Sequence, residues 1–556
     1  MKIARNVGVI GAFVTLLISP NTNLDPINII KFTCLLIGAG YLIADYPLVI
    51  SSFKKNGKSY KIFVCASLFG VLYQFIGLII TEAPIWQKIF GAFGRNTGFL
   101  TYFALAVIVL IASTLREVSQ VLVIIKLFIY VLVFEIIYGI IQWSGLDPYS
   151  WKNLYNPIIG TLGNPNFSSA YFGIASALIL PLVFSKVLSV RFRILLAICY
   201  PTLFFLTIAS DSWQGTGLVF IAAALYILYW IRSSKKISLI GFPLILIYGV
   251  ISILAVLGFR GDGPLGQFLN KPTFTIRMDY WNTAINTIMN FPIFGVGSDS
   301  FGDWFRLMRN EETVARIGLN VSTNSAHNVV LDMMVNNGIL VGLTYLLVVV
   351  MILWKSIPLI WYPHRNNNPI FLSIFLAWFC YQIQSLVSIN QIGIGIWGWI
   401  FQGVMVAILF KPSEFVVNHD FELHSKKTKK VKIETSPSLL RILATPVFII
   451  IALIPLVSDG KLISSLESGD VERVYAAATA FPLEVSRINY VTQAFSQNQL
   501  PELSLKSAKF GVEKFPNNYD AWDLLRQVTN SQADRDLAIS NLKRLDPFYE
   551  KYTLSQ

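Results

Sequence analysis

The chain has 556 residues, of which 54% are hydrophobic and only 13% are charged. This composition excludes a single soluble domain, because soluble proteins carry about twice that share of charged residues. The formal net charge of +13 would suit a nucleic-acid-binding protein, but the basic residues are scattered between apolar segments and lack interleaved aromatic residues for stacking. We therefore expect an all-α polytopic membrane protein that binds no nucleic acid.

Apolar segments long enough to cross a bilayer, which takes ~20 residues per helix, recur through most of the chain. We expect about 12 to 13 transmembrane helices, at residues 6–20, 27–48, 60–80, 98–115, 120–143, 166–186, 193–209, 213–231, 237–258, 338–360, 369–388, 393–411 and 441–458.

Lys and Arg gather in alternate loops, and this asymmetry orients the chain because cytoplasmic loops accumulate positive charge. One set of loops holds Lys2, Arg5, Lys54, Lys55, Lys58, Lys61, Arg116, Lys186, Arg191, Arg193, Arg232, Lys235, Lys236, Lys355 and Arg365. The short loops on the other side hold only Lys88, Arg95 and Lys152. We expect a cytoplasmic N-terminus and, with thirteen spans, an extracytoplasmic C-terminal region.

The spans divide the chain into parts. We expect a transmembrane domain at 1–411 with a long outer loop at 259–337, a basic cytoplasmic linker at 412–440, a last transmembrane helix at 441–458 and an outer tail at 459–556. In the tail, Phe481-Pro482 and Phe515-Pro516 stand 34 residues apart, and Asp546-Pro547 follows. That period is typical of tetratricopeptide repeats. The tail is either an interaction module for a protein partner or a helical cap packed on the outer face.

The outer loop opens with a predicted amphipathic helix, in which Ile276, Tyr280, Trp281, Ala284, Ile285 and Ile288 share one face. We expect its aromatic residues at the lipid headgroup boundary. Gly295 and Gly297 allow the backbone to turn back toward the membrane. Arg277 starts this helix and suits a phosphate ligand, because its guanidinium binds two oxygens at once. The alternative is that Arg277 pairs with Asp279 or reaches the membrane surface.

His327 is the only one of four histidines on the outer side. Ser322 to Ser325 precede it and are expected to cap a helix, which would place His327 in the first helical turn. The positive end of the helix dipole disfavours an imidazolium there. A neutral imidazole accepts a proton from an alcohol, so His327 is a candidate general base. The alternative is a structural histidine.

Further polar residues stand at the outer ends of spans: Glu135, Asn164, Asn166 and Arg95. A carboxyl at the depth of Glu135 is costly unless it is paired or used. The outer loops contain neither an Asp-rich motif for a divalent metal nor a phosphate-binding P-loop. We expect no metal and no cofactor.

Three sequence segments, GTLGNPN, RMDYWNTAINTIMNFPIFGVG and SAHNVVLDMMVNNGILVGL, in this order resemble the O-antigen ligase and O-antigen polymerase superfamily. The resemblance implies a GT-C-like membrane fold that transfers a glycan from an undecaprenyl-diphosphate carrier to an acceptor hydroxyl, without metal and with inversion. It implies that His327 activates the hydroxyl and that Arg277 holds the diphosphate. The substrate-binding candidates are Arg95, Glu135, Asn164, Asn166, Gln214 and Asn328.

One segment departs from the family pattern, which often has a second arginine at the start of a later span. Here that stretch reads ASDSWQGTG, with Asp211 and Gln214 but no arginine. Arg95, Arg260 or Arg306 are the candidates for the second phosphate contact.

The acceptor stays open: a lipid core for a ligase, another carrier-linked repeat for a polymerase, or a protein hydroxyl for a protein O-oligosaccharyltransferase. A flippase or other transporter of lipid-linked oligosaccharides is the alternative from another class. Transporters tend to place charged residues and broken helices near the membrane midplane, whereas the polar groups here gather at the outer face. We expect a multi-pass protein of the cytoplasmic membrane, in contact with membrane lipids.

Overall fold

The structure is a computed structural model that describes residues 1–151, 156–233, 249–250, 253–254, 257, 272–362, 368–411 and 439–550. These residues form helices and no strand, which confirms the all-α fold. The first half contains α1 (Lys2–Leu16), α2 (Asn28–Leu42), η1 (Ile43–Asp45), α3 (Tyr46–Lys55), α4 (Lys58–Ile80), α5 (Ile85–Phe90), α6 (Phe99–Ala112), α7 (Val118–Trp143), η2 (Gly160–Leu162), α8 (Pro165–Val183), α9 (Val190–Ala209) and α10 (Trp213–Ser233).

The second half contains the outer-loop helices, three further apolar helices and the tail. These are α13 (Pro272–Asn290), α14 (Phe301–Met308), α15 (Glu311–Ile317), α16 (Val329–Asn337), α17 (Ile339–Trp361), α18 (Pro369–Ser385), α19 (Ile392–Phe410), α20 (Leu439–Ser468), α21 (Val471–Ala478), α22 (Val485–Gln497), α23 (Pro501–Lys514), α24 (Tyr519–Val528) and α25 (Gln532–Leu545).

The predicted spans coincide with helices wherever the structure describes them. Nine helices in the described part of the chain are long and apolar enough to cross a membrane, and α6 and α18 are shorter apolar helices. Most of the predicted span at 237–258, and residues 412–438 of the predicted basic linker at 412–440, lie outside the described residues. The chain is therefore a multi-pass membrane protein.

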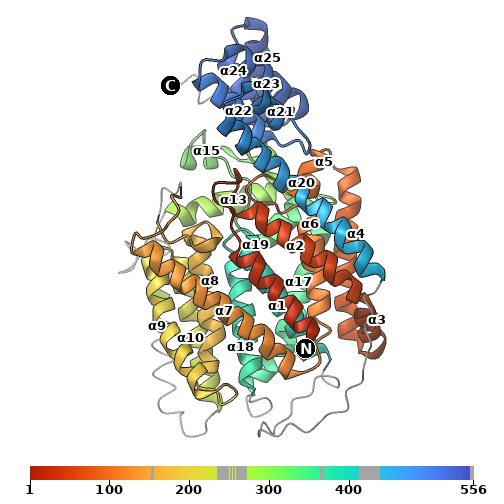
Figure 1. The fold of residues 1–556 in the computed structure, drawn as a ribbon, viewed down its shortest axis with the longest axis vertical. Coiled ribbons are helices and arrows are strands. Elements are labelled where there is room, and N and C mark those ends of the chain that lie inside the picture. The colour runs from red at the N-terminus through yellow and green to blue at the C-terminus, as the bar shows by residue number, and fades with distance from the viewer. Residues whose placement is uncertain are drawn as a thin grey trace.

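The helices form a bundle whose centre is α19. This helix packs against α1, α6 and α18, and the large side chains of Trp397 and Phe401 are fully buried against Phe128 of α7. On one side of the bundle α8 packs against α9, α10 and α18, and on the other α2 packs against α6 and α20 (Figure 1). A helix buried on all sides can be apolar all round, as α19 is.

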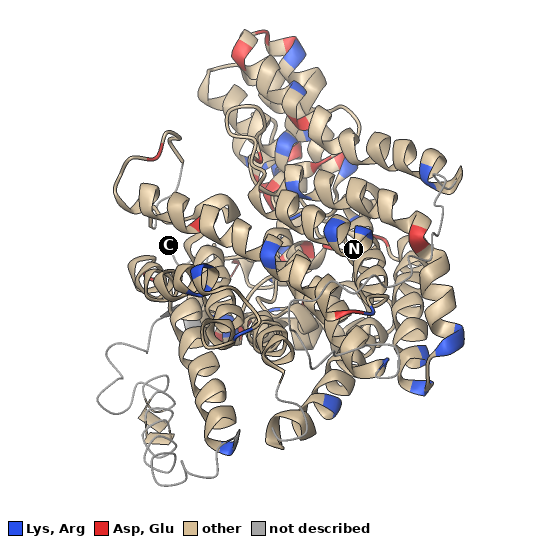
Figure 2. Cartoon of the chain, turned by 60° about the horizontal axis from the view of Figure 1, so that its bottom comes forward, with Lys and Arg blue, Asp and Glu red and all other residues tan. Residues whose placement is uncertain are grey.

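Charged residues gather at helix ends, in the outer loop and in the tail, while most of the length of the bundle helices carries none (Figure 2). The N-terminus lies toward one end of the bundle and the tail covers the other (Figure 1). The N-terminus and the tail therefore lie at different ends of the bundle. The assignment of the N-terminal end to the cytoplasm stays a prediction.

The outer loop folds into a small layer, α13 to α16, between the bundle and the tail (Figure 1). Its core includes Ala284, Ile288, Phe301 and Phe305. The predicted glycine turn is present: Gly295 and Gly297 have φ of +67° and +107°. A Cβ on Gly295 would lie 2.4 Å from the carbonyl oxygen of Val335, so the close approach of this turn to the end of α16 requires glycine.

The tail begins on the last apolar helix, which does not end near residue 458 as predicted. α20 continues to Ser468 and leads directly into α21. The dipeptides Phe481-Pro482, Phe515-Pro516 and Asp546-Pro547 follow α21, α23 and α25, respectively. This agrees with the rule that proline cannot continue a helix. The helical character of the tail is confirmed, and its assignment to tetratricopeptide repeats stays a prediction.

The tail packs against the outer loop through polar and aromatic contacts. Arg309 after α14 pairs with Asp546 at 2.5 Å, with both side chains fully buried. Trp86 of α5 meets Phe481 edge to face, with ring centroids 4.5 Å apart. A buried ion pair requires close fitting on both sides, so the tail holds a defined position on the outer face.

Candidate active site

His327 lies just before α16 and not in its first turn as predicted. The residue that caps α16 is Asn328, whose side chain accepts hydrogen bonds from the backbone N–H groups of Val330 and Leu331. His327 itself has a φ of +53°, a left-handed conformation that non-glycine residues adopt at a cost. The predicted cap from Ser322 to Ser325 is therefore replaced by Asn328.

Hydrogen bonding determines which ring nitrogen of His327 carries the proton. Nδ1 lies 3.2 Å from the backbone oxygen of Ser325. A carbonyl oxygen only accepts, so Nδ1 carries the hydrogen and Nε2 presents its lone pair. The ring packs at 5.3 Å against Tyr280, which in turn meets Phe305 edge to face. Tyr280 thus faces the site, in place of the predicted position at the lipid headgroups.

The pKa of His327 is lowered to about 4. Burial is the main cause, because it disfavours the charged imidazolium, and the positive charges of Arg277 and Arg95 add to it. The predicted direction agrees with this, whereas the predicted cause, the dipole of α16, differs. His327 is neutral at pH 7, as a general base must be.

A buried carboxylate cluster that sequence reasoning missed positions the His327 loop. Asp332 accepts hydrogen bonds from Ser325 Oγ at 2.5 Å and from the backbone N–H of Ala326 at 2.8 Å. The Ser325 hydroxyl accepts one from the backbone N–H of His327 at 3.0 Å. Asp332 stands one turn into α16, so its spacing after His327 is the sequence signal that could have revealed it.

Arg95 forms ion pairs within this carboxylate cluster. Its guanidinium pairs with Asp299 at 3.2 Å and with Asp332 at 3.8 Å, and it donates to the backbone oxygen of Asn324. Asp299 also accepts from the backbone N–H groups of Ala92 and Thr97. Because all three charged side chains are buried, Arg95 joins three loops and is not placed as the second phosphate ligand.

The other two candidates for that contact are likewise not assigned. Arg306 donates to the backbone oxygens of Leu319 and Asn320, at 2.7 Å and 3.2 Å, and lies over the ring of Tyr519 at 4.1 Å. These contacts hold the guanidinium within the protein. Arg260 lies outside the described residues.

Arg277 stands in the second turn of α13 and contacts Gln214 at the start of α10. With the amide oriented to satisfy both groups, the Gln214 oxygen accepts from the two terminal nitrogens of Arg277 at 2.7 Å and 3.3 Å. The alternative partner Asp279 pairs with Arg316. None of these contacts pairs Arg277 with a carboxylate, so they leave its positive charge uncompensated. That charge acts electrostatically on His327.

The asparagines after η2 stand next to this contact. Asn164 caps α8 by accepting from the backbone N–H of Asn166 at 2.9 Å. The Asn166 side chain accepts from Ser212 Oγ at 2.8 Å, and Ser212 lies two residues before Gln214. These contacts align the starts of α8 and α10 beside Arg277.

Glu135 is fully buried in α7, and its carboxylate accepts hydrogen bonds from the side chain and backbone N–H of Thr161 in η2. Lys31 of α2 is close enough to interact with it electrostatically. These contacts satisfy the buried carboxyl and tie α7 to the loop before α8. We assign Glu135 a structural role, because its contacts involve neither His327 nor Arg277.

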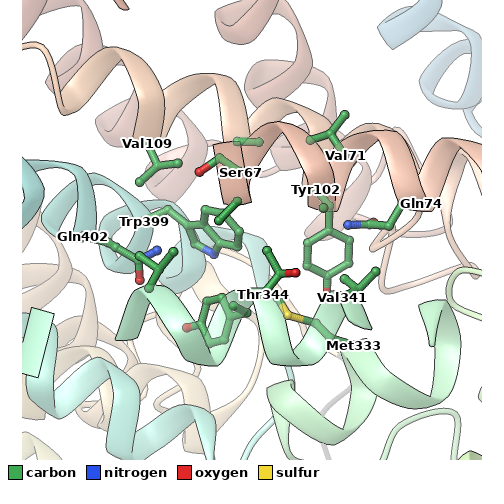
Figure 3. Close-up of a pocket in the computed structure, with 15 residues that line it drawn as sticks. Ser67, Val71, Gln74, Tyr102, Val109, Met333, Val341, Thr344, Trp399 and Gln402 are labelled. Atoms are coloured by element: carbon green, nitrogen blue, oxygen red, sulfur yellow. The ribbon is translucent and has the colours of Figure 1, made fainter. Parts of the chain in front are cut away.

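Two cavities flank the cluster. The outer one has a volume of about 450 Å³ and lies between the outer loop and the tail, with His327 and Tyr280 in its lining. The inner one, of about 50 Å³, is lined by α4, α6, α16, α17 and α19 (Figure 3). Its wall is mostly apolar, with Gln74, Tyr102 and Gln402 as polar exceptions.

Part of the chain matches a known protein family. A family model described as O-antigen ligase matches residues 198–346. Residues 198–346 are therefore similar to the O-antigen ligase family. The matched region runs from α9 into α17 and includes Gln214, Arg277, His327 and Asn328, whereas Arg95, Glu135, Asn164 and Asn166 lie before it. No curated protein matches the chain.

The O-antigen ligase match confirms the resemblance to the O-antigen ligase and polymerase superfamily. The match covers less than half of the chain, and over those residues it supports an enzyme of the O-antigen ligase and polymerase kind.

Proposed function

We propose that this protein transfers a glycan from an undecaprenyl-diphosphate carrier to an acceptor hydroxyl at the outer face of the cytoplasmic membrane. The observation that carries the proposal is the pairing of a neutral imidazole with an arginine. His327 presents Nε2 as a proton acceptor, and Arg277, which acts electrostatically on it, is held by a neutral amide. Transfer to a hydroxyl requires a base for the acceptor and a cation for the departing diphosphate.

The proposed step is a single displacement at the anomeric carbon. His327 Nε2 takes the proton of the acceptor hydroxyl as the hydroxyl oxygen bonds to the anomeric carbon. The bond from that carbon to the diphosphate oxygen breaks, and its electron pair stays on the diphosphate, next to the Arg277 guanidinium. The carrier diphosphate departs. Because attack and departure occur on opposite sides of the carbon, the configuration inverts.

Arg277 suits its proposed role for a physical reason. Its contact with Gln214 orients the guanidinium without neutralising it, so its charge can act on a phosphate. A guanidinium binds two phosphate oxygens in parallel, which a lysine cannot do. A bound diphosphate also brings negative charge close to His327, which raises the pKa of the imidazole toward the working pH and strengthens it as a base.

The test is turnover by the purified protein in lipid nanodiscs, with carrier-linked glycan as donor and with a lipid core, a carrier-linked repeat or a peptide as acceptor. Release of carrier diphosphate and the new glycosidic bond are measured together. His327→Ala removes the base and should lower turnover by ~10² to 10⁴ while donor binding stays intact. Arg277→Lys should weaken donor binding and turnover together.

His364→Ala is the matched control, because this histidine is predicted on the cytoplasmic side and should leave turnover unchanged. If both site variants retain wild-type turnover at equal protein levels, the proposed transferase site is wrong. Movement of the intact donor across the bilayer without release of carrier diphosphate would support the transporter alternative instead.

A further inference from the structure

The outer cavity is built by two parts of the chain that lie far apart in sequence. The outer loop contributes Tyr280, Asp303 and His327, and the tail contributes the starts of α22 and α24. From the tail come Glu484, Val485, Ser486, Asn518, Tyr519 and Asp520. The volume of about 450 Å³ is within the usual range for a small-molecule site.

Contacts across the cavity rim hold these two parts in register. Asn518 of the tail donates to Asp303 of α14 at 3.0 Å, and Gln87 donates to the same carboxylate at 3.3 Å. Tyr519 packs its ring against the guanidinium of Arg306. The buried pair of Arg309 and Asp546 lies at the same interface. The tail therefore forms a wall of the cavity in the described structure.

The positions of His327 and Arg277 indicate which side of the site receives the acceptor and which receives the donor diphosphate. His327 and Tyr280 line the cavity, whereas Arg277 stands one helical turn before Tyr280, outside the lining. In a displacement, the attacking hydroxyl and the departing diphosphate lie on opposite sides of the anomeric carbon. With the diphosphate at Arg277, the hydroxyl must come from the cavity side of His327.

The lining has the chemistry of a sugar-binding surface. Carboxylates, carboxamides and hydroxyls alternate around it, and these groups accept and donate hydrogen bonds as sugar hydroxyls do. The rings of Tyr280 and Tyr519 add two apolar faces.

The charge of the lining disfavours an anionic acceptor. It includes Asp303, Glu484 and Asp520, as well as Asp299, which pairs with Arg95, but only one cation, Arg306. A phosphorylated or acidic acceptor would meet an excess of negative charge there.

We propose that this cavity binds the acceptor as an uncharged glycan chain, and that the tail supplies part of the acceptor site through the starts of α22 and α24. This inference rests on the proposed transfer reaction. It gives the tail a role in substrate binding in place of the predicted role in binding a protein partner.

The test blocks the cavity from the tail side. Ser486 is exposed at the start of α22 and lines the cavity, so Ser486→Trp fills the space without disturbing a buried core. The expected result is a rise in the acceptor KM of roughly tenfold or more with unchanged donor binding. Asp536→Asn, on the exposed surface of α25 and outside the cavity lining, is the control that should behave as wild type.

A second measurement does not depend on turnover. In the His327→Ala protein, binding is measured by calorimetry for uncharged oligosaccharides, for uronic-acid oligosaccharides of the same length and for serine-containing peptides. The uncharged oligosaccharides should bind, and Tyr519→Ala or Ser486→Trp in the same background should weaken them. Preferred binding of the acidic glycans or the peptides would overturn the assignment of acceptor class.

The two proposals can fail separately. If His327→Ala and Arg277→Lys abolish turnover but Ser486→Trp keeps the wild-type acceptor KM, the cavity is not the acceptor site although the reaction stands. If the site variants retain wild-type turnover, the reaction itself is wrong, whatever the cavity binds.

Discussion

Gln214 accepts hydrogen bonds from both terminal nitrogens of Arg277, at 2.7 Å and 3.3 Å, and so joins the start of α10 to α13. Related sequences often have an arginine near the position of Gln214, which suggested that a phosphate contact was missing here. The structure shows that the glutamine is next to the arginine that remains. An uncharged partner orients Arg277 while leaving its charge available to a phosphate.

We predict that Gln214→Ala weakens donor affinity by about 3- to 10-fold, the range for loss of one neutral hydrogen-bonding partner. Gln214→Glu should weaken it more, because a carboxylate at this distance would compete with the diphosphate for Arg277. The measurement is equilibrium binding of carrier-linked glycan. Asp536→Asn, on the exposed surface of α25, is the control. Equal affinity in Gln214→Glu and wild type would contradict this role.

The lowered pKa of His327 predicts a specific pH dependence. The neutral imidazole is the active form, so activity is lost as the pH falls through the pKa of His327, which is about 4. An ordinary histidine, with a pKa near 6.5, would already be mostly protonated at pH 5.5.

We therefore expect the kcat/KM of the wild type for the donor to stay level from pH 7.5 down to about 5 and to fall below that. The profile of kcat should show a higher midpoint, because bound diphosphate favours the imidazolium. Intrinsic fluorescence at each pH reports whether the protein is still folded. A kcat/KM midpoint near 6.5 in folded protein would show that His327 is not shielded as described.

Asp332 is expected to act on turnover through the loop that carries His327. Asp332→Asn keeps one acceptor oxygen, which can serve the backbone N–H of Ala326, but its NH2 group replaces the oxygen that accepts from Ser325 Oγ. It also removes the charge that faces Arg95. We predict roughly tenfold slower turnover with donor affinity near wild type, since a displaced general base loses efficiency steeply with distance.

Asp332→Ala should be worse and should also lower thermal stability, because it leaves the buried Ser325 hydroxyl without this acceptor and the Arg95 charge less compensated. Melting curves of the detergent-solubilised proteins separate the two effects. Unchanged turnover in Asp332→Asn would mean that Ser325 and the backbone alone hold the loop.

Turnover is expected to continue in EDTA. In the proposed reaction Arg277 supplies the positive charge that stabilises the departing diphosphate. Within the described residues, no group of three or more His, Cys, Asp or Glu side chains is arranged to hold a metal ion. Turnover by membranes washed with EDTA should match that of untreated membranes. Loss of turnover that Mg²⁺ or Mn²⁺ restores would refute a metal-independent reaction.

The sequence by itself determined where the apolar helices lie and pointed to two residues of the candidate site. Apolar runs of bilayer length predict spans because each polar group buried in lipid raises the free energy at its own position in the chain. The described helices agree with these runs. Likewise, Arg277 stood out because it starts the predicted outer-loop helix, and His327 because it is the only histidine predicted on the outer side. The structure places the two within electrostatic reach of each other.

Only the tertiary structure decided the partners of each charge. Arg95 was a candidate phosphate ligand by sequence, yet it is buried against Asp299 and Asp332, and Asp279 pairs with Arg316 and not with Arg277. The sequence also placed His327 inside a helix, whereas Asn328 caps that helix and the tail closes a cavity over the histidine. Local patterns predict helices because helical hydrogen bonds and apolar faces repeat over a few residues. Ion pairs and cavity walls join segments distant in the chain, so their identity depends on how the whole bundle packs.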